Sequence, residues 1–280
     1  MADTSLVNLV TALADDELVL GHRHSEWTGY APHLEEDVAF SSIAQDEIGH
    51  ATAYYSLVAK LTGDDADRMA LGREPGEYRN AILCERPNRE WAYTLVRHWL
   101  YDTADAFRLE ALEDSADTEL AALATKIRRE ERYHLIHAES WMKRVAHGPV
   151  EGRTKLADAT ALAFPETIGL FEPFEDEEHA VKQGWLPVPS DELRRRFFDR
   201  VQTSLDELGL PTEIHSHTAA KAEFVASSSG DLISSEAQSD PAGDDGADSL
   251  GGRRGRHTGD FESLWADMTT QYRSHPGARW

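Results

Sequence analysis

Residues 43–51 read Ile43-Ala-Gln-Asp-Glu-Ile-Gly-His-Ala51, and within this stretch Glu47 and His50 stand three positions apart. A second Glu-x-x-His pair follows later in the chain, formed by Glu131 and His134. Residues three apart lie on one face of an α-helix, about one turn from each other. Each pair can therefore ligate one metal ion, or bridge one ion and ligate its neighbour.

An acidic residue precedes each pair by about 30 positions, Glu17 before Glu47 and Asp102 before Glu131. Asp105, one turn further on, is the alternative to Asp102, although the spacing favours Asp102. A carboxylate followed by Glu-x-x-His, repeated once, is typical of a two-metal carboxylate site inside a four-helix bundle. Carboxylate oxygens with imidazole nitrogens suit two iron or manganese ions. The predicted ligands are Glu17, Glu47, His50, Asp102, Glu131 and His134.

The competing interpretation is that these acids belong to solvated helix faces, as is common in an acidic chain. Their neighbours favour core positions instead, and Gly49 is expected to allow close helix approach; the apolar neighbours are Ile43, Ala44, Ala51, Leu135 and Ile136. Buried carboxylates without partners are costly, so several together need metals, protons or bases. Ion pairs with arginine are the structural alternative, and the candidates are Arg23, Arg97, Arg108 and Arg132.

Other charged groups carry weaker signals. Four histidines are predicted to be surface or packing residues rather than ligands: His22, His24, His33 and His98. Arg253, Arg254 and Arg256 stand beside glycines and are expected to form an exposed linker end, with a phosphate or an acidic partner surface as the alternatives. The sequence contains no Gly-x-Gly-x-x-Gly, P-loop or Gly-x-Ser-x-Gly motif, so nucleotide cradling and serine hydrolase chemistry have no support.

Apolar residues at helical spacing predict a chain that is helical almost throughout. Helices are expected over 4–24, 32–61, 88–114, 117–147, 151–172 and 189–208, with a last one around Phe261 to Tyr272. The predicted fold class is all-α, a four-helix bundle with additional C-terminal helices. We expect a bundle core over 1–147, additional helices packed on it over 148–224, a flexible acidic, Ser- and Gly-rich linker over 225–257, and a C-terminal helix and tail over 258–280.

Composition limits the class of protein. The 280 residues include 51 acidic and 28 basic side chains, giving a net charge of −23, and Arg far outnumbers Lys. This acid excess argues against nucleic acid or an anionic membrane as a partner and suggests a surface adapted to a salt-rich cytoplasm. The single cysteine, Cys84, fits a reducing compartment. With no secretory signal and no apolar stretch long enough to span a membrane, the expected location is cytoplasmic.

Four segments of the chain resemble the PaaC-type subunits of phenylacetyl-CoA epoxidase (ring 1,2-epoxidase) complexes, within the ferritin-like superfamily. They are Asp16-Glu-Leu-Val-Leu-Gly-His-Arg-His-Ser-Glu-Trp27, Ala31-Pro-His-Leu-Glu-Glu-Asp37, Arg129-Glu-Glu-Arg-Tyr-His134 and Gly251-Gly-Arg-Arg-Gly-Arg-His-Thr258. The resemblance extends from about residue 5 to Trp280, and the last of these segments is specific to this subunit type.

The resemblance implies a ferritin-like helical fold and a heteromeric complex with a PaaA-type subunit that carries the catalytic di-iron centre. Such a complex epoxidises the ring of phenylacetyl-CoA with dioxygen and electrons from a reductase. The PaaC-type subunit is a non-catalytic scaffold whose metal positions are substituted in well-known members. This chain departs from that pattern, because Glu17, Glu47, His50, Glu131 and His134 are all able to ligate metal. Two explanations of these residues remain open. They form an ancestral site that still binds two iron or manganese ions, or their carboxylates are neutralised by groups within the protein.

The leading hypothesis is a structural subunit of this monooxygenase complex, which binds phenylacetyl-CoA as an assembly, with no catalytic residue assigned to this chain. The alternative is an autonomous di-iron oxygenase or oxidase that acts on an acyl-CoA or aromatic substrate. A ferritin-like metal-storage or peroxide-handling protein is the third hypothesis. The C-terminal third of the chain argues against it, because a minimal bundle does not need that segment.

Overall fold

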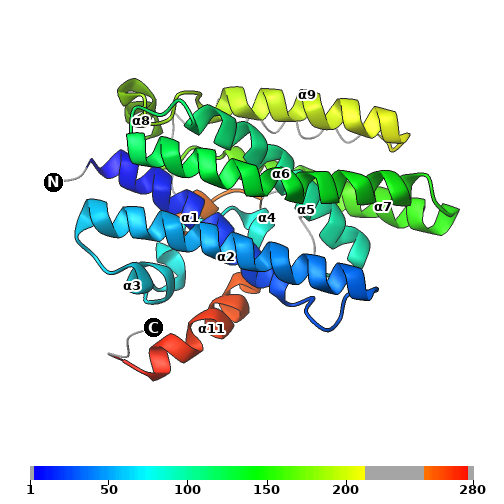
Figure 1. Cartoon of the computed structure of the whole chain (residues 1–280), viewed down its shortest axis with the longest axis horizontal. Helices are drawn as coiled ribbons and strands as arrows, with labels where there is room; N and C mark the ends of the chain where they lie inside the picture. The colour runs from blue at the N-terminus through cyan, green and yellow to red at the C-terminus, as the bar shows by residue number, and fades with distance from the viewer. Residues whose placement is uncertain (1–2, 212–248, 277–280) are drawn as a thin grey trace, which may run out of the picture.

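Four long helices form the frame of the molecule. The computed structural model describes residues 3–211 and 249–276. The frame consists of α1 (Thr4–Ser25), α2 (Leu34–Thr62), α5 (Trp91–Leu112) and α6 (Thr118–Ala146), which lie side by side as two hairpins, α1–α2 and α5–α6 (Figure 1). No strand occurs among the described residues. The prediction of an all-α, ferritin-like four-helix bundle is confirmed.

The remaining elements are shorter and pack around this frame. They are α3 (Ala66–Leu71), η1 (Pro75–Glu77), α4 (Ile82–Glu85), α7 (Val150–Ala163), η2 (Phe164–Phe171), α8 (Glu177–Gln183), α9 (Ser190–Leu208), η3 (Gly252–Arg254) and α11 (Gly259–Ser274). Helices α7 and α9 contact α5 and α6, whereas α11 lies against α1, α3 and α4 (Figure 1). None of the described helices is long and apolar enough to cross a membrane.

Local chemistry explains where the frame helices begin and end. The Asp3 carboxylate accepts a hydrogen bond from the Ser5 backbone N–H (3.0 Å) at the start of α1, and Asp117 accepts one from the Leu120 N–H (2.8 Å) at the start of α6. These carboxylates satisfy N–H groups that have no partner within the helix. Helix α2 ends at Gly63, whose φ of 79° is the left-handed conformation that glycine adopts without strain. The sequence therefore sets the boundaries of the bundle.

The helix predicted over 151–172 is divided in two. The α-helical part ends at Ala163, and residues Phe164–Phe171 form a 3₁₀ helix. Pro165 lies at the start of this second part, where its missing N–H costs no intrahelical bond, whereas inside a continuous α-helix it would remove one. The change of helix type turns Leu170 and Phe171 into the core.

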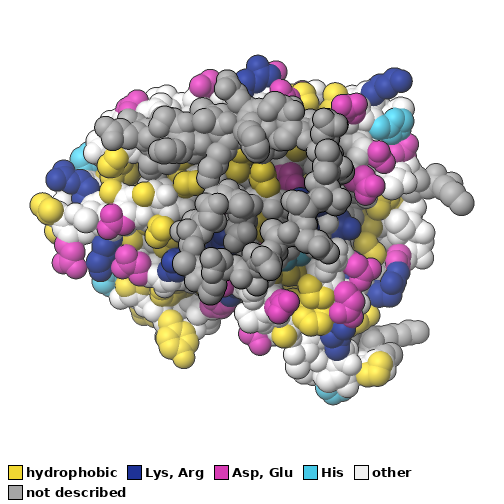
Figure 2. All heavy atoms as spheres, turned by 180° about the vertical axis from the view of Figure 1, so that it is seen from behind, with side chains coloured by type: hydrophobic (Ala, Val, Ile, Leu, Met, Phe, Trp, Pro, Cys, Tyr) yellow, Lys and Arg dark blue, Asp and Glu magenta, His cyan; other side chains and the backbone are white. Residues whose placement is uncertain are grey.

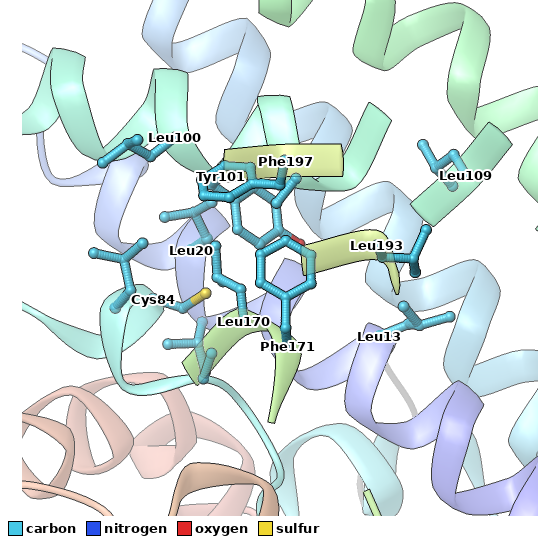
Figure 3. Close-up of a cluster of buried hydrophobic side chains, with 14 of the residues drawn as sticks. Leu13, Leu20, Cys84, Leu100, Tyr101, Leu109, Leu170, Phe171, Leu193 and Phe197 are labelled. Atoms are coloured by element: carbon cyan, nitrogen blue, oxygen red, sulfur yellow. The ribbon is translucent and has the colours of Figure 1, made fainter. Parts of the chain in front are cut away.

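One hydrophobic core joins the bundle to the added helices. Figure 3 shows side chains from α1, α4, α5, η2 and α9 converging, among them Leu20, Tyr101 and Phe197. The rings of Phe171 and Phe197 are 5.1 Å apart between centroids. Because these residues share the bundle's core, α9 and η2 are integral to the domain. On the outside, acidic and basic side chains are interspersed over the visible part of one face (Figure 2).

The segment after residue 249 is packed against the bundle. Arg253 is 4% exposed and its guanidinium contacts the carboxylate of Asp16 in α1. Arg254 and Arg256 are exposed. The expectation of an exposed linker end is therefore wrong for Arg253, because a buried acid from a distant helix neutralises it. The rest of the predicted flexible linker, residues 225–248, lies outside the described residues.

Candidate metal centre

The six predicted ligands all lie inside the bundle, contributed by all four frame helices. Glu17 comes from α1, Glu47 and His50 from α2, Asp102 from α5, and Glu131 and His134 from α6. Each is at most 4% exposed. The interpretation of these acids as parts of a solvated helix face is therefore wrong, and their burial requires partners that compensate the cost of desolvation.

Close packing of α1 against α2 supports this position. A Cβ added to Gly21 of α1 would lie 2.9 Å from Ile48 Cγ1 and 3.2 Å from Glu47 Cβ. Gly49, which was expected to serve this purpose, is exposed and would meet nothing within 4 Å. The helical phase explains the error, since Gly49 faces away from α1 while Glu47 and Ile48 face towards it. Ile136 is likewise exposed rather than buried.

Three of the six side chains gather into one group. His50 Nδ1 lies 3.3 Å from Glu17 Oε2 and 3.2 Å from Glu131 Oε1. One ligand atom from each of these residues lies within 4.8 Å of the others. His134 joins the edge of this group, with its Nδ1 3.0 Å from Glu131 Oε1, and the Tyr101 hydroxyl donates to Glu17 Oε1 at 2.8 Å.

Glu47 and Asp102 are engaged elsewhere. Both carboxylate oxygens of Glu47 lie within 2.9 Å of His24 Nδ1, and Asp102 Oδ2 lies 3.2 Å from His98 Nδ1. His24, Glu47 and His98 form a second group whose ligand atoms lie within 4.8 Å of one another. The structure thus divides the sextet between two neighbouring groups, and coordination by all six residues stays a prediction.

His24 and His98 lie in the core beside predicted ligands, which the prediction of surface or packing residues left open. Both are fully buried, whereas His22 is half-buried and His33 is exposed. Helical spacing carried the signal. His24 stands two helical turns after Glu17 on α1, and His98 stands one turn before Asp102 on α5. Each imidazole therefore shares a helix face with a predicted ligand.

Arginine neutralises Asp105 rather than Asp102. Arg108 Nε lies 3.2 Å from Asp105 Oδ1, and the same guanidinium donates to Asp16 Oδ2 at 3.0 Å. Neither oxygen of Asp102 has a hydrogen-bond partner among the described residues. These contacts favour Asp102 as the ligand from α5. The other arginine candidates make no ion pair with the six, since Arg23 and Arg97 bind backbone and neighbouring groups and Arg132 is exposed.

Burial and charge set the protonation of the group. Burial raises the pKa of Glu17, and it raises the pKa values of Glu47 and Asp102 well above their usual range. Burial acts in the same direction on Glu131, but the neighbouring His134 and His50 outweigh it and lower the pKa of that carboxyl. Burial opposes protonation of the two imidazoles. Even so, Glu131 and Glu17 raise the pKa of His50 to about 12, and Glu131 raises that of His134 to about 10. Without metal, Glu131 is a carboxylate between two imidazolium groups.

Buried polar atoms left without partners test whether metal fits here. Glu131 Oε1 and His134 Nδ1 approach within 3.0 Å, yet neither makes a hydrogen bond of acceptable geometry among the described residues, and the same holds for both Asp102 oxygens. Such atoms are costly unless something satisfies them. A cation held by Glu17, His50 and Glu131 would satisfy Glu131 Oε1, and the mixture of carboxylate and imidazole suits iron or manganese. The residues present therefore fit a metal.

A hollow on the surface leads to this group. It lies between α5 and α6, has a volume of about 550 Å³, and reaches Glu131. Its rim carries charges of both signs, from Glu110, Glu113, Arg128, Arg129 and Arg132. Arg128 is paired across it with Glu110 and Glu113. The predicted ligands are therefore buried, and among them Glu131 lines the hollow.

Comparison with known proteins agrees with this geometry. The sequence model of the PaaA/PaaC family, described as phenylacetic acid catabolic protein, matches residues 1–224. The chain is also similar to the C-type subunit of the 1,2-phenylacetyl-CoA epoxidase of Escherichia coli (strain K12), with 29% identity over 271 residues, which is 96% of each chain. Since the family match spans the whole bundle and the helices up to α9, the chain belongs to the PaaA/PaaC family of phenylacetic acid catabolic proteins.

Proposed function

We propose that this chain is the C-type subunit of a multicomponent phenylacetyl-CoA epoxidase in phenylacetate catabolism. The single observation that carries the proposal is the similarity to the C-type subunit of such an epoxidase along 96% of both chains, which includes the C-terminal segment. That segment is built into the fold here through the contact between Arg253 and Asp16. A bundle that only held metal would not need it.

In this proposal the chain acts as the structural partner of a PaaA-type catalytic subunit, and the assembly binds phenylacetyl-CoA. The proposed location is the cytoplasm, which the single cysteine, Cys84, supports. The chain's architecture suits a scaffold, because the core shared by α1, α5 and α9 fixes the bundle rigidly. No residue of this chain is assigned a catalytic role.

The proposal includes a retained metal-binding capacity for iron or manganese. Glu17, His50 and Glu131 would hold an ion, with His134 beside Glu131. Asp102 of α5 lies at His98 and makes no hydrogen bond among the described residues. Tyr101 orients Glu17 through its hydroxyl, and burial excludes bulk water from the group. A bound iron would supply redox chemistry, including reaction with dioxygen. The Glu131 side of the group faces the opening between α5 and α6.

An autonomous di-iron oxygenase or oxidase is the second candidate, and one observation favours it. A hollow of about 550 Å³ that Glu131 lines lies beside the buried group, and a purely structural bundle does not require one. The ferritin-like storage hypothesis has no comparable support. The integral C-terminal segment argues against it.

Co-purification tests the proposal. The tagged chain would be co-expressed with the PaaA-type subunit of the same organism, and the eluate analysed by size exclusion with light scattering. We expect a stable heteromeric complex, and no oxidation of phenylacetyl-CoA by this chain alone when reductase and dioxygen are supplied. A PaaA-type subunit expressed with an unrelated ferritin-like bundle provides the control. Failure to form a complex, together with turnover by the isolated chain, would refute the scaffold role.

A further inference from the structure

Two fully buried imidazoles lie beside the bundle's carboxylates with unused ring nitrogens. His98 is 0% exposed and neither of its ring nitrogens makes a hydrogen bond among the described residues. His24 is also 0% exposed, and its Nε2 makes no hydrogen bond among the described residues. A neutral imidazole normally has a partner for both nitrogens when it is buried, because a buried polar atom without a hydrogen bond destabilises the fold. The two ring nitrogens of His98 and Nε2 of His24 are therefore available to a ligand.

The third member of this group is a carboxylate. Glu47 places its two oxygens 2.9 and 2.8 Å from His24 Nδ1. Ligand atoms from His24, Glu47 and His98 lie within 4.8 Å of one another. Two donors of one ion, each about 2.0–2.2 Å from it, are about 3 Å apart, which matches the separation of Glu47 from His24 Nδ1. An ion shared by these two residues would therefore take the place of the proton between them. Asp102 lies 3.2 Å from His98 Nδ1 and supplies a further carboxylate at the edge.

The rings of Phe40, His24 and His98 pack against one another, and His98 also lies 6.4 Å from His134 between ring centroids, so the group adjoins the cluster of Glu17, His50 and Glu131. The ring of Phe40 packs on both imidazoles, with centroids 5.3 Å from His24 and 5.4 Å from His98. The two imidazoles meet edge to face at 5.2 Å. This packing leaves both imidazoles 0% exposed. Packing alone explains why the rings are buried, but it does not explain why they are histidines rather than apolar residues.

We propose that His24, Glu47 and His98 bind one divalent first-row transition-metal ion, at a position distinct from the cluster of Glu17, His50 and Glu131. Two imidazoles and one carboxylate with open positions are a known donor set for ferrous iron and zinc. The inference goes beyond the proposed function, since a structural subunit needs no ion at this position. Glu47 is then a ligand of this second ion rather than of the cluster that contains His50.

Cobalt(II) is the probe that tests the proposal. The purified full-length chain would be stripped with a chelator and titrated with Co²⁺ while its visible absorption is recorded. Three variants of the proposed site, His24→Asn, His98→Asn and His98→Cys, would be compared with His50→Asn and Glu131→Gln in the neighbouring cluster. His22→Asn, two residues from His24 on the same helix and outside both groups, is the matched control.

We expect His24→Asn and His98→Asn to lose one bound Co²⁺ relative to the wild-type chain, whereas His50→Asn, Glu131→Gln and His22→Asn keep that ion. In His98→Cys the same ion should acquire an intense sulfur-to-cobalt charge-transfer band, because thiolate is a strong ligand. This gain of signal shows the site even if the asparagine variants fold poorly. Unchanged cobalt stoichiometry in folded His24→Asn and His98→Asn, or a folded His98→Cys without the band, would overturn the proposal. Binding of no cobalt by the wild-type chain would do so as well.

Discussion

A guanidinium nitrogen of Arg253 lies 2.6 Å from Oδ2 of Asp16, although the two residues are 237 positions apart in the chain. A second nitrogen of the same group donates to Asp16 Oδ1 at 2.8 Å, so the pair is bidentate. Asp16 immediately precedes Glu17. The C-terminal segment is thereby fixed to α1 next to a predicted metal ligand.

Replacing Arg253 is expected to destabilise the whole fold. Arg253→Ala leaves the buried Asp16 with Arg108 as its remaining cationic partner. Removal of one partner of a buried ion pair typically costs about 3–5 kcal/mol, and we expect the lower end because Arg108 remains. The free energy of unfolding, measured by urea denaturation, checks this. Arg254→Ala is the control. Arg254 is exposed, so its loss should change stability by no more than about 0.5 kcal/mol. Equal effects of the two variants would contradict the structural role of Arg253.

Close contact between α1 and α2 predicts opposite results for two glycines. Gly21→Leu should destabilise the fold by about 1–3 kcal/mol, because even a Cβ there approaches Ile48 to 2.9 Å. Gly49→Leu should be neutral or stabilising, because the position is open and leucine is the better helix former. Urea denaturation of both variants gives the comparison. A neutral Gly21→Leu variant would show that the two helices are further apart than described.

Metal binding should release protons. His50 and His134 have pKa values raised to about 12 and about 10, so both imidazoles are protonated at pH 7 and must lose a proton before they ligate. Burial also raises the pKa of Glu17, which favours its protonated form. Metal affinity should therefore rise with pH, about tenfold per pH unit for each proton displaced. Calorimetric titration with Mn²⁺ in two buffers of different ionisation enthalpy measures the protons released. Identical heats in both buffers would contradict the assignment.

The acid excess predicts dependence on salt. A net charge of −23 repels itself within the compact state, and salt screens that repulsion. We expect the urea midpoint to fall steadily as sodium chloride is lowered from molar to millimolar concentration. Over this range the free energy of unfolding should fall by more than the roughly 0.5 kcal/mol that is typical of a single surface substitution. A midpoint independent of salt would refute the proposed adaptation to a salt-rich cytoplasm.

The sequence was sufficient for the fold, and it identified three residues that lie together, Glu17, His50 and Glu131. Helical spacing, acidic first turns and terminal glycines predicted the four frame helices to within three residues at their ends. The repeated Glu-x-x-His pattern identified side chains that are indeed buried together, such as His50 and Glu131. These features are local, because periodicity within one helix determines which face is buried.

The features that sequence analysis missed depend on how helices meet. The phase of α2 against α1 decides that Gly21, not Gly49, lies at the contact. The orientation of Glu47 towards His24, rather than towards His50, likewise depends on how α2 packs against α1. The burial of Arg253 depends on an acid 237 residues away, which no local pattern reveals. In each case a long-range contact selected one of several locally acceptable outcomes.

Turnover in a reconstituted mixture tests the central claim most directly. Oxygen-dependent epoxidation of phenylacetyl-CoA would be measured in a mixture of the PaaA-type subunit, the reductase and the remaining epoxidase subunits. The mixture would be assayed with and without this chain. The account predicts that activity is lost when this chain is omitted, is restored when it is added back, and is absent when the PaaA-type subunit is omitted. Epoxidation by this chain in the absence of the PaaA-type subunit would contradict it.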